Sequence, residues 1–285
     1  MKARASCYGA GTIVNAIATG KGAAFGLALR VTATAETRPE GFGVKTHVPD
    51  GTDPTLVADG AARVLRRSRR KAGLEVSVDS EIPMSRGLKS SSAVANAVVL
   101  ASARALGLEL EPLQVIRIGV DAAVDAGVTI TGAFDDACAS FFGGIAVTDN
   151  RARKLLASDR FPEGLVAVVQ VPTRTITKPS LRGIDFSPIR PQVEEAFRYA
   201  VQGDYFRAIE TNSAAYASLL GIDETPAMRA RVAGALTAGI TGAGPAIIAL
   251  TKPAHLDAVR RALDDGMSQI RVVGLNTMES REVIA

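Results

Sequence analysis

Apolar and polar residues alternate along residues 27–36 (LALRVTATAE), the pattern typical of a half-buried strand. The TRPEG segment after it predicts a turn, and residues 43–48 (GVKTHV) predict the hairpin partner of this strand. Another alternation, at residues 74–80 (LEVSVDS), predicts a further strand. A hairpin that precedes any crossover helix favours an α+β layered fold over a doubly wound parallel sheet.

Helical spacing follows each helix-start signal in the first half of the chain. Pro54 after Asp53 predicts a helix that Asp53 caps and Gly73 ends. Three serines at 90–92 predict the start of a second helix, because a serine hydroxyl satisfies an amide that has no intrahelical partner. The pattern then predicts the end of that helix near 107, a helix at 112–127, a loop at 129–140 and a strand at 144–149.

The second half of the chain continues the mixture of strands and helices. A charged segment at residues 150–160 is interpreted as the crossing point between two domains. Beyond it the pattern predicts a strand at 165–171, helices within 189–238, a strand at 246–250, one more helix and a final strand at 270–275.

Composition indicates a globular protein, because 47% of the 285 residues are hydrophobic. Cys7 and Cys138 form neither a disulfide framework nor a zinc motif, and they favour a reducing, cytoplasmic location. We expect neither export nor membrane insertion, since no charged-then-apolar leader and no long uncharged run occur. His47 and His255, the only two histidines, lack the partners of a triad or a metal site, which favours structural roles.

The net charge of +4 is mild. Its densest part, RRSRRK at residues 66–71, falls at the predicted end of a helix, where the backbone dipole favours cations. We therefore favour a solvated helix end over a site for a polyanion. The absence of tryptophan and the 5% share of aromatic residues also argue against a nucleic-acid partner.

Glycine is concentrated in three stretches, at residues 8–26, 83–93 and 241–246. The first is predicted to be a long, shaped loop, because glycine weakens helices and strands. Any one such stretch is typical of an ordinary turn. Three in one chain favour a ligand-binding role.

The second glycine stretch has the clearest chemistry, because it joins a predicted strand to a predicted helix. Gly87 allows backbone to approach a ligand, and the free amides at the helix start favour anionic oxygens, which predicts a phosphate site. Lys89 adds a cation, and Ser91 is the candidate hydroxyl for a Mg²⁺ ion that bridges phosphates. Neither the GxxxxGK[ST] motif nor a suitably flanked GxGxxG motif is present.

Phosphoryl transfer also requires a group that deprotonates or positions the acceptor hydroxyl. Asp135 and Asp136, in the FDDA segment, are the candidates. The alternative is a pair of acids that stabilises a helix N-terminus. If the two carboxylates share a site, their repulsion raises the apparent pKa of one.

The motifs resemble those of a known superfamily. IPMSRGLKSSSA and TGAGPA resemble the second and third motifs of the GHMP kinases, named for galactokinase, homoserine kinase, mevalonate kinase and phosphomevalonate kinase. More narrowly, GAGTIVNAIATGKGAAFG, RGLKSSSA and TGAFDDACAS, in this order, resemble the archaeal-type shikimate kinases. The resemblance covers nearly the whole chain.

This resemblance implies an N-terminal α+β domain at 1–155, a ferredoxin-like C-terminal domain at 156–285, and ATP in the cleft between them. It implies that ATP, with Mg²⁺, phosphorylates the 3-hydroxyl of shikimate for aromatic amino-acid biosynthesis through chorismate. The oligomeric state stays open between monomer and homodimer. The alternatives are a homoserine or mevalonate kinase, and a nonenzymatic nucleotide or sugar sensor of the same fold.

The resemblance also suggests roles for individual residues. Asp135 aligns with the acid that acts as base in mevalonate kinase-like members, and Asp136 falls where several members have asparagine. Ala10 stands where many relatives have a lysine, so Lys21 becomes the candidate catalytic cation. Lys89 replaces the glycine of the usual GLGSS and adds a charge at the phosphates.

The residues expected to bind ATP lie in the second and third glycine stretches. Pro245 interrupts the third stretch, which leaves the contact of that loop with the nucleotide open. The expected ATP-binding residues are Pro83, Met84, Ser85, Arg86, Gly87, Leu88, Lys89, Ser90, Ser91, Ser92, Ala93, Gly242 and Gly244.

The shikimate carboxylate suits recognition by arginine. The segment at residues 172–182 offers Arg174, Lys178 and Arg182, of which Arg174 is the candidate; a solvated polar loop is the alternative. Asn15 is expected either to bind a substrate hydroxyl or to close an Asx-turn.

Overall fold

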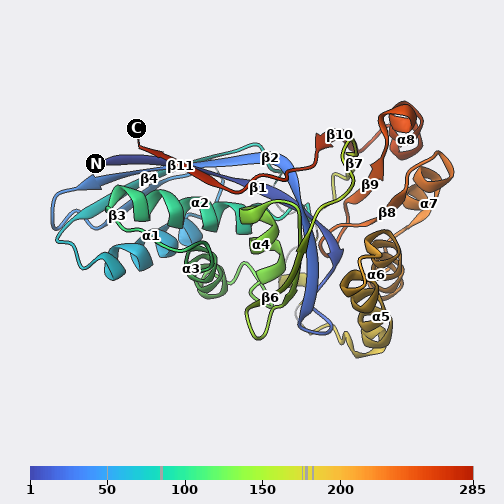
Figure 1. Cartoon of the computed structure of the whole chain (residues 1–285), viewed down its shortest axis with the longest axis horizontal. Coiled ribbons are helices and arrows are strands. Elements are labelled where there is room, and N and C mark those ends of the chain that lie inside the picture. Colours follow the sequence, from blue (N-terminus) through green and yellow to red (C-terminus); the bar gives the residue numbers. More distant parts are fainter. Residues whose placement is uncertain (50, 84–85, 175, 177–178, 182, 285) are drawn as a thin grey trace.

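The computed structural model describes residues 1–285 except 50, 84–85, 175, 177–178, 182 and 285. Its described part contains two sheets that follow one another along the long axis of the molecule (Figure 1). A seven-stranded sheet with helices α1–α4 occupies one end, and a four-stranded sheet with α5–α8 occupies the other. This is the mixed α and β architecture in two domains that the sequence predicts. The position of the boundary at residues 155 and 156 stays a prediction.

The seven-stranded sheet is built around a long antiparallel pair, β1 and β2, near the N-terminus. Its strands are β1 (Lys2–Val14), β2 (Lys21–Arg38), β3 (Val44–His47), β4 (Gly73–Ser80), β5 (Ile145–Asp149), β6 (Lys154–Asp159) and β11 (Arg281–Ile284). β11 brings the C-terminal end of the chain back beside β1. The segment at 150–160, interpreted as a domain crossing, contains β6, which pairs with β5. The chain enters the second sheet only after that strand.

The glycine-rich stretch at residues 8–26 is not the predicted long loop. It forms most of β1, the start of β2 and a short connection between them. Glycine serves close packing here: a Cβ at Gly11 would lie 2.5 Å from the ring of Phe25, and one at Gly22 would lie 2.4 Å from Asp135 Oδ2. Single-sequence patterns read glycine as a turn signal, whereas these strands use it where neighbouring groups come too close for a side chain.

The predicted hairpin partner of the 27–36 strand is also wrong. β3 pairs in parallel with β4, and β4 occupies the place beside β2 that the prediction gave to β3. Parallel neighbours require a crossover, which is α1 (Thr55–Ser68). The helix begins one residue later than predicted, so Pro54 and not Asp53 is its N-cap, although Asp53 Oδ1 still accepts the Thr55 amide. The helix ends before a left-handed Arg69, and Gly73 opens β4 instead of ending the helix.

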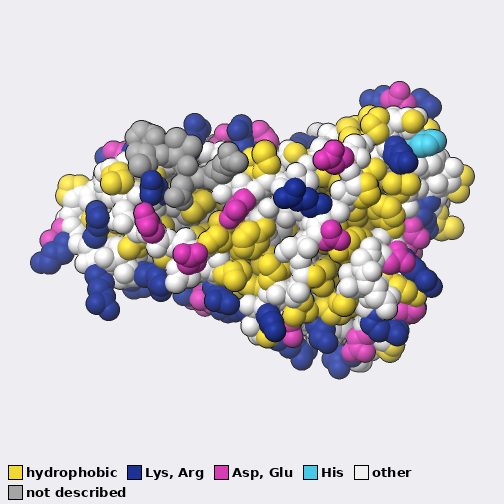
Figure 2. Space-filling model, in the orientation of Figure 1, with side chains coloured by type: hydrophobic (Ala, Val, Ile, Leu, Met, Phe, Trp, Pro, Cys, Tyr) yellow, Lys and Arg dark blue, Asp and Glu magenta, His cyan; other side chains and the backbone are white. Residues whose placement is uncertain are grey.

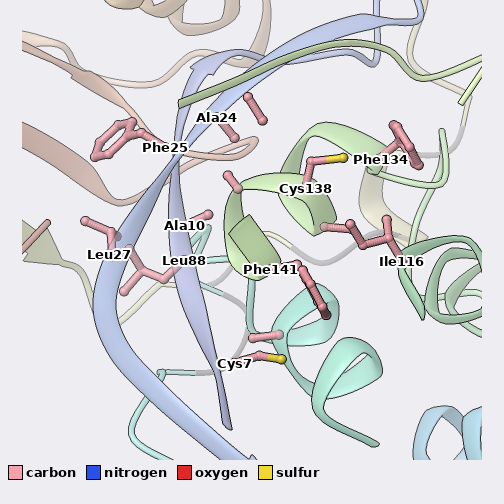
Figure 3. Packing of buried hydrophobic residues seen from close by; sticks show 14 of the residues in the cluster. Cys7, Ala10, Ala24, Phe25, Leu27, Leu88, Ile116, Phe134, Cys138 and Phe141 are labelled. Carbon is pink, nitrogen blue, oxygen red and sulfur yellow. The ribbon is translucent and has the colours of Figure 1, made fainter. Parts of the chain in front are cut away.

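Three further helices pack on the same side of the seven-stranded sheet as α1 (Figure 1). They are α2 (Ser90–Ala105), α3 (Pro112–Asp125) and α4 (Phe134–Phe142). α2 and α3 confirm their predictions within two residues. The loop predicted at 129–140 is wrong in its second half, because α4 begins at Phe134. Phe134, Cys138 and Phe141 of this helix lie in the core cluster shown in Figure 3.

The second sheet is antiparallel and has the order β10-β7-β9-β8 within the described residues. Its strands are β7 (Val166–Val171), β8 (Thr237–Ile240), β9 (Ile247–Thr251) and β10 (Gln269–Gly274), and its helices are α5 (Arg190–Val201), α6 (Tyr205–Leu220), α7 (Thr225–Val232) and α8 (Leu256–Leu263). The predicted strands at 165–171, 246–250 and 270–275 are confirmed to within one residue, while the sequence pattern missed β8.

Helix α6 connects the two sheets through the β1–β2 connection. The side chain of Asn212 accepts the Asn15 amide at 2.9 Å. The Tyr216 hydroxyl accepts the Ala18 amide at 3.1 Å and donates to the Asn15 carbonyl at 3.0 Å. These buried bonds hold the connection in one conformation. It lies beside the acids of α4, because Ala16 and Asp135 would both contact a side chain at Gly22.

Charged side chains are mixed in sign over the face shown in Figure 2. The arginines of the RRSRRK segment are exposed around the end of α1, consistent with a solvated helix end. No helix in the described part of the chain has both the length and the apolar character needed to cross a membrane.

Candidate active site

A cavity of about 350 Å³ opens between the starts of α2 and α4 and the loop that joins β8 to β9. Both the second and the third glycine stretches therefore contribute to one site. The lining residues are Pro83, Gly87–Ser92, Ala123, Gly127–Thr129, Gly132, Ala133, Asp136, Ile176 and Gly242–Gly244. Most of the described residues that the sequence assigned to ATP lie in this set.

The start of α2 presents its backbone to the cavity. The helix begins at Ser90 as predicted, but the residue before it, Lys89, is left-handed with φ 63°, and no side chain caps the helix. The expected serine cap is therefore wrong. The first turn contains no acid, so the amides there and the positive end of the helix dipole are available to an anion.

Two glycine loops meet backbone to backbone beside these amides. Gly87 has φ 82°, and a Cβ on it would lie 2.2 Å from the Thr241 carbonyl oxygen. Gly242 has φ 67°, and a Cβ on it would lie 2.8 Å from Gly87 Cα. The Thr241 hydroxyl donates to the Gly87 carbonyl at 2.9 Å. Only glycine allows both the left-handed backbone and this close approach.

β1 and the residue just after it hold the loop of the third glycine stretch through hydrogen bonds to Gly242. Thr12 Oγ1 accepts the Gly242 amide at 2.7 Å, and Asn15 Nδ2 donates to the Gly242 carbonyl at 2.8 Å. Asn15 Oδ1 accepts the Ile17 amide at 3.0 Å, which closes the Asx-turn named as its alternative role. Asn15 is buried and both ends of its amide are engaged. Contact of this side chain with a substrate hydroxyl stays a prediction.

The first turn of α4 carries the two acids, Asp135 and Asp136, which are 3% and 7% exposed. Asp136 faces the cavity, and its Oδ1 lies 2.9 Å from Lys89 Nζ. Both partners of this ion pair are about 10% exposed, so solvent screens the attraction weakly. Lys89 thus connects the start of α2 to the start of α4.

Asp135 faces away from the cavity lining, toward β2 and the end of β5. Asn150 Nδ2 donates to Asp135 Oδ1 at 2.7 Å. Burial, and then the charge of Asp136, raise the pKa of Asp135 to about 7, although Lys89 and Asn150 act in the opposite direction. A carboxyl with this pKa is suited to accept a proton near neutral pH.

The remaining predicted residues are distributed as follows. Arg86 Nη1 donates to the carbonyls of Thr173 and Arg174, both at 2.5 Å. Arg86 therefore joins the second glycine stretch, at residues 83–93, to the segment at 172–182. The Arg174 side chain is exposed, and its contact with a carboxylate stays a prediction. Leu88 and Ala93 are buried in the core and anchor the loop. Met84, Ser85, Lys178 and Arg182 lie outside the described residues.

Lys21 lies at the start of β2, and its ammonium is 5.6 Å from the ring centroid of Phe197. It is exposed and does not line the cavity. Its role as catalytic cation stays a prediction, and the geometry favours Lys89, whose ammonium lies in the site.

Both cysteines are buried, and burial raises the pKa of the Cys7 and Cys138 thiols above the ordinary value, which disfavours a nucleophilic role. Sequence reasoning missed several lining residues, among them Ala123, Gly127 and Ile176, and it also missed Thr148 and Asn150 beside Asp135. Thr148 lies in β5, a strand that the sequence pattern predicted, and Asn150 comes directly after it, but no motif marks either residue. Only the folded chain shows that the end of β5 reaches the first turn of α4.

Comparison with known proteins agrees with this geometry. The family model for the GHMP kinases N terminal domain matches residues 56–144, and the model for the GHMP kinases C terminal matches residues 228–269. Shikimate kinase of Pyrococcus furiosus is 42% identical over 268 residues, which cover 89% of this chain and 93% of that protein. Shikimate kinase of Methanosarcina acetivorans is 37% identical over 284 residues, which cover 99% and 95%.

Solved structures share the fold at low identity. Homoserine kinase from Cytophaga hutchinsonii superimposes with a TM-score of 0.77 at 19% identity, covering 98% of this chain and 97% of that chain. Lactococcus lactis galactokinase in complex with galactose gives a TM-score of 0.78 at 16% identity, covering 99% and 95%. With the close relatives above, these findings establish that the chain belongs to the shikimate kinase family of GHMP kinases.

Proposed function

We propose that this protein transfers the γ-phosphoryl group of ATP to the 3-hydroxyl of shikimate, producing shikimate 3-phosphate and ADP. One observation carries the proposal: Lys89 joins an uncapped helix start to Asp136 across one cavity, and Asp136 stands next to the buried Asp135 in the first turn of α4. The first feature suits a polyphosphate and the second suits an alcohol that must lose a proton. Shikimate is named because proteins with that activity are about 40% identical to this chain.

The backbone carries the phosphate end of the proposed reaction. The amides at the start of α2 and the loop at Gly242–Gly244 surround the cavity, and the α2 amides give phosphate oxygens fixed donors in place of water. Lys89 supplies a full positive charge beside them, held in place by Asp136. Preorganised donors stabilise the charge on the transferring group without having to reorganise during the reaction.

Asp135 carries the acceptor end. With a pKa of about 7, its carboxylate is partly ionised at neutral pH and can take the proton of the attacking hydroxyl as the new P–O bond forms. ADP leaves with the electron pair of the broken P–O bond, and the proton stays on Asp135 until solvent removes it.

The cavity also fits a Mg²⁺ ion carried by ATP. Ser90, Ser91 and Ser92, which carry hydroxyl groups, are among its lining residues, and Mg²⁺ prefers a few protein oxygens together with phosphates and water. The described residues hold no cluster of three or more His, Cys, Asp or Glu side chains that could bind a metal without such a ligand. We assign Ser91 as the protein ligand; the ion would neutralise charge on the phosphates.

The test is a coupled assay of ADP release by the purified protein with ATP, Mg²⁺ and each of three acceptors: shikimate, homoserine and mevalonate. We expect turnover with shikimate, and the product identified as the 3-phosphate by phosphorus NMR. Turnover with one of the other acceptors instead would identify a sister kinase. Nucleotide binding without turnover of any acceptor would favour a sensor and reject the proposal.

A further inference from the structure

The end of β5 contributes a buried hydrogen-bond chain to the first turn of α4. Thr148 Oγ1 donates to Asn150 Oδ1 at 2.6 Å, and Asn150 Nδ2 donates to Asp135 Oδ1 at 2.7 Å. Asn150 is 3% exposed and Thr148 is fully buried. Both side chains therefore act where water does not compete for their hydrogen bonds.

The orientation of the Asn150 amide follows from its neighbours. The Asp135 backbone amide, which can only donate, lies 3.2 Å from the same Oδ1 that accepts from Thr148. The atom facing these donors must be oxygen, so the NH₂ group must face the Asp135 carboxyl. One side chain thus binds Asp135 through both its backbone and its carboxylate.

We infer that Asn150, oriented by Thr148, is a positioning residue that holds the Asp135 carboxylate in its ionised form and in one rotamer for proton transfer. The inference rests on the proposed role of Asp135 as the base. The hydrogen bond from Asn150 occupies Oδ1 of Asp135, so Oδ2 is the oxygen left to accept the proton. Oδ2 lies in the space that a side chain at Gly22 would need. A donor to the carboxylate favours the charged form, which is the form that accepts the proton.

Other groups near Asp135 must be included in any pH argument. Its own helix contributes acidic neighbours, the start of α2 contributes a cation, and α6 contributes a phenol. On the side of β2 and β5 the contacting residues, Gly22 and Asn150, are neutral, and the charged Lys21 and Asp149 adjoin them in the chain. These neighbours are Asp136, Cys138, Lys89, Tyr216, Gly22 and Asn150. The neutral donors to this carboxylate are the Asn150 side chain and the Asp136 backbone amide, so removal of the Asn150 side chain changes the ionisation of Asp135 without changing the charge count.

The test compares kcat of the whole enzyme with that of Asn150→Ala and Thr148→Val from about pH 5 to pH 9. In the plot of kcat against pH, the acidic limb is the rise that reports ionisation of Asp135. We expect Asn150→Ala to move this limb up by about one pH unit, because a hydrogen bond to a charged group is lost. With a starting pKa of about 7, kcat at pH 7 then falls about fivefold while the KM for ATP stays unchanged. Thr148→Val shifts the limb in the same direction by about half as much.

Asn276→Ala is the matched control, since Asn276 is also buried and its side-chain amide bonds the backbone of Met278 rather than an acid. We expect it to cost stability without moving the limb. An unmoved limb in Asn150→Ala, or the same movement in the control, overturns the inference. If Asn150→Ala does not fold, the Thr148→Val profile decides. Loss of turnover in Asp135→Asn together with an unmoved limb rejects only the positioning role, whereas full turnover in Asp135→Asn removes the base itself.

Discussion

The starts of α2 and α4 have the same local geometry and opposite chemistry. In both, the residue before the helix is left-handed, with φ 63° at Lys89 and φ 47° at Ala133, and the side chain of that residue does not cap the helix. The first turn of α2 contains no acid and opens on a cavity, whereas the first turn of α4 contains Asp135 and Asp136 and is buried.

The difference shows that an uncapped helix start can be used in two ways. At α2 the free amides remain available to phosphate oxygens that come with the nucleotide. At α4 the chain supplies its own anions, and burial changes one of them from a permanent charge into a proton acceptor. Lys89 belongs to both, because it precedes one helix and pairs with an acid of the other.

Removing the acid that makes α4 different has the largest expected effect. Asp135→Asn keeps the side-chain shape and its bond to Asn150 but cannot accept a proton, so we expect kcat to fall by about 10² to 10⁴. Steady-state kinetics measure this fall, and calorimetry should show unchanged ATP binding. Wild-type turnover in this variant would remove Asp135 from the chemistry.

Disturbing the backbone surface at α2 has the next largest effect. In Gly87→Ala the new Cβ would lie 2.2 Å from the Thr241 carbonyl, at φ 82°, so the two loops must separate. We expect ATP binding to weaken by about one to two orders of magnitude and stability to fall by about 2 to 4 kcal/mol. Gly41→Ala is the control, since it has φ 86° with no atom within 4 Å, and it should lose only about 1 kcal/mol. Equal effects of both variants would mean that the contact is unimportant.

Asp135 should also make the folded protein less stable as pH rises. The pKa of Asp135 is about 7 in the folded chain against an ordinary 3.8, so its contribution to stability is present below pH 3.8 and is lost as pH rises to about 7. Asp135→Asn should therefore stabilise the protein above pH 7 by roughly 2 to 4 kcal/mol and have little effect near pH 4. Urea unfolding at several pH values measures the difference; a constant difference contradicts the assigned pKa.

The Lys89–Asp136 ion pair connects the two helix starts, and its contribution to ATP binding can be separated from its contribution to stability. Lys89→Met should raise the KM for ATP about tenfold and also destabilise the fold, because Asp136 is left buried without its partner. Adding Asp136→Asn should restore much of the stability but not the KM. Thermal unfolding and kinetics of both variants measure these effects. A KM that recovers in the double variant would mean that Lys89 serves the fold and not the nucleotide.

Lys21 provides the smallest expected change. Its ammonium is exposed and lies over Phe197 outside the cavity, so we expect Lys21→Met to lower kcat less than about threefold. A fall of 100-fold or more would instead establish the catalytic cation that the sequence motif suggested. Comparison with Lys89→Met under the same conditions decides between the two lysines.

Much of this protein could be predicted from local patterns. Apolar periodicity located α2, α3, β4, β5, β7, β9 and β10 within two residues, because each has a face or a run that must be buried. The motifs at Gly87–Ser92 and Asp135–Asp136 identified both halves of the candidate site, since phosphate and proton transfer need few residue types.

Contacts between distant segments decided the rest. The sequence alone determined which residue types stand at the site; it did not determine that the glycines of β1 and β2 serve close packing, that β4 replaces β3 beside β2, or that Asn150 reaches Asp135. Strand partners and the pKa of a buried acid depend on which groups the fold brings within a few ångströms and how far it excludes water. Local propensity contains neither quantity, and only the tertiary structure supplies them.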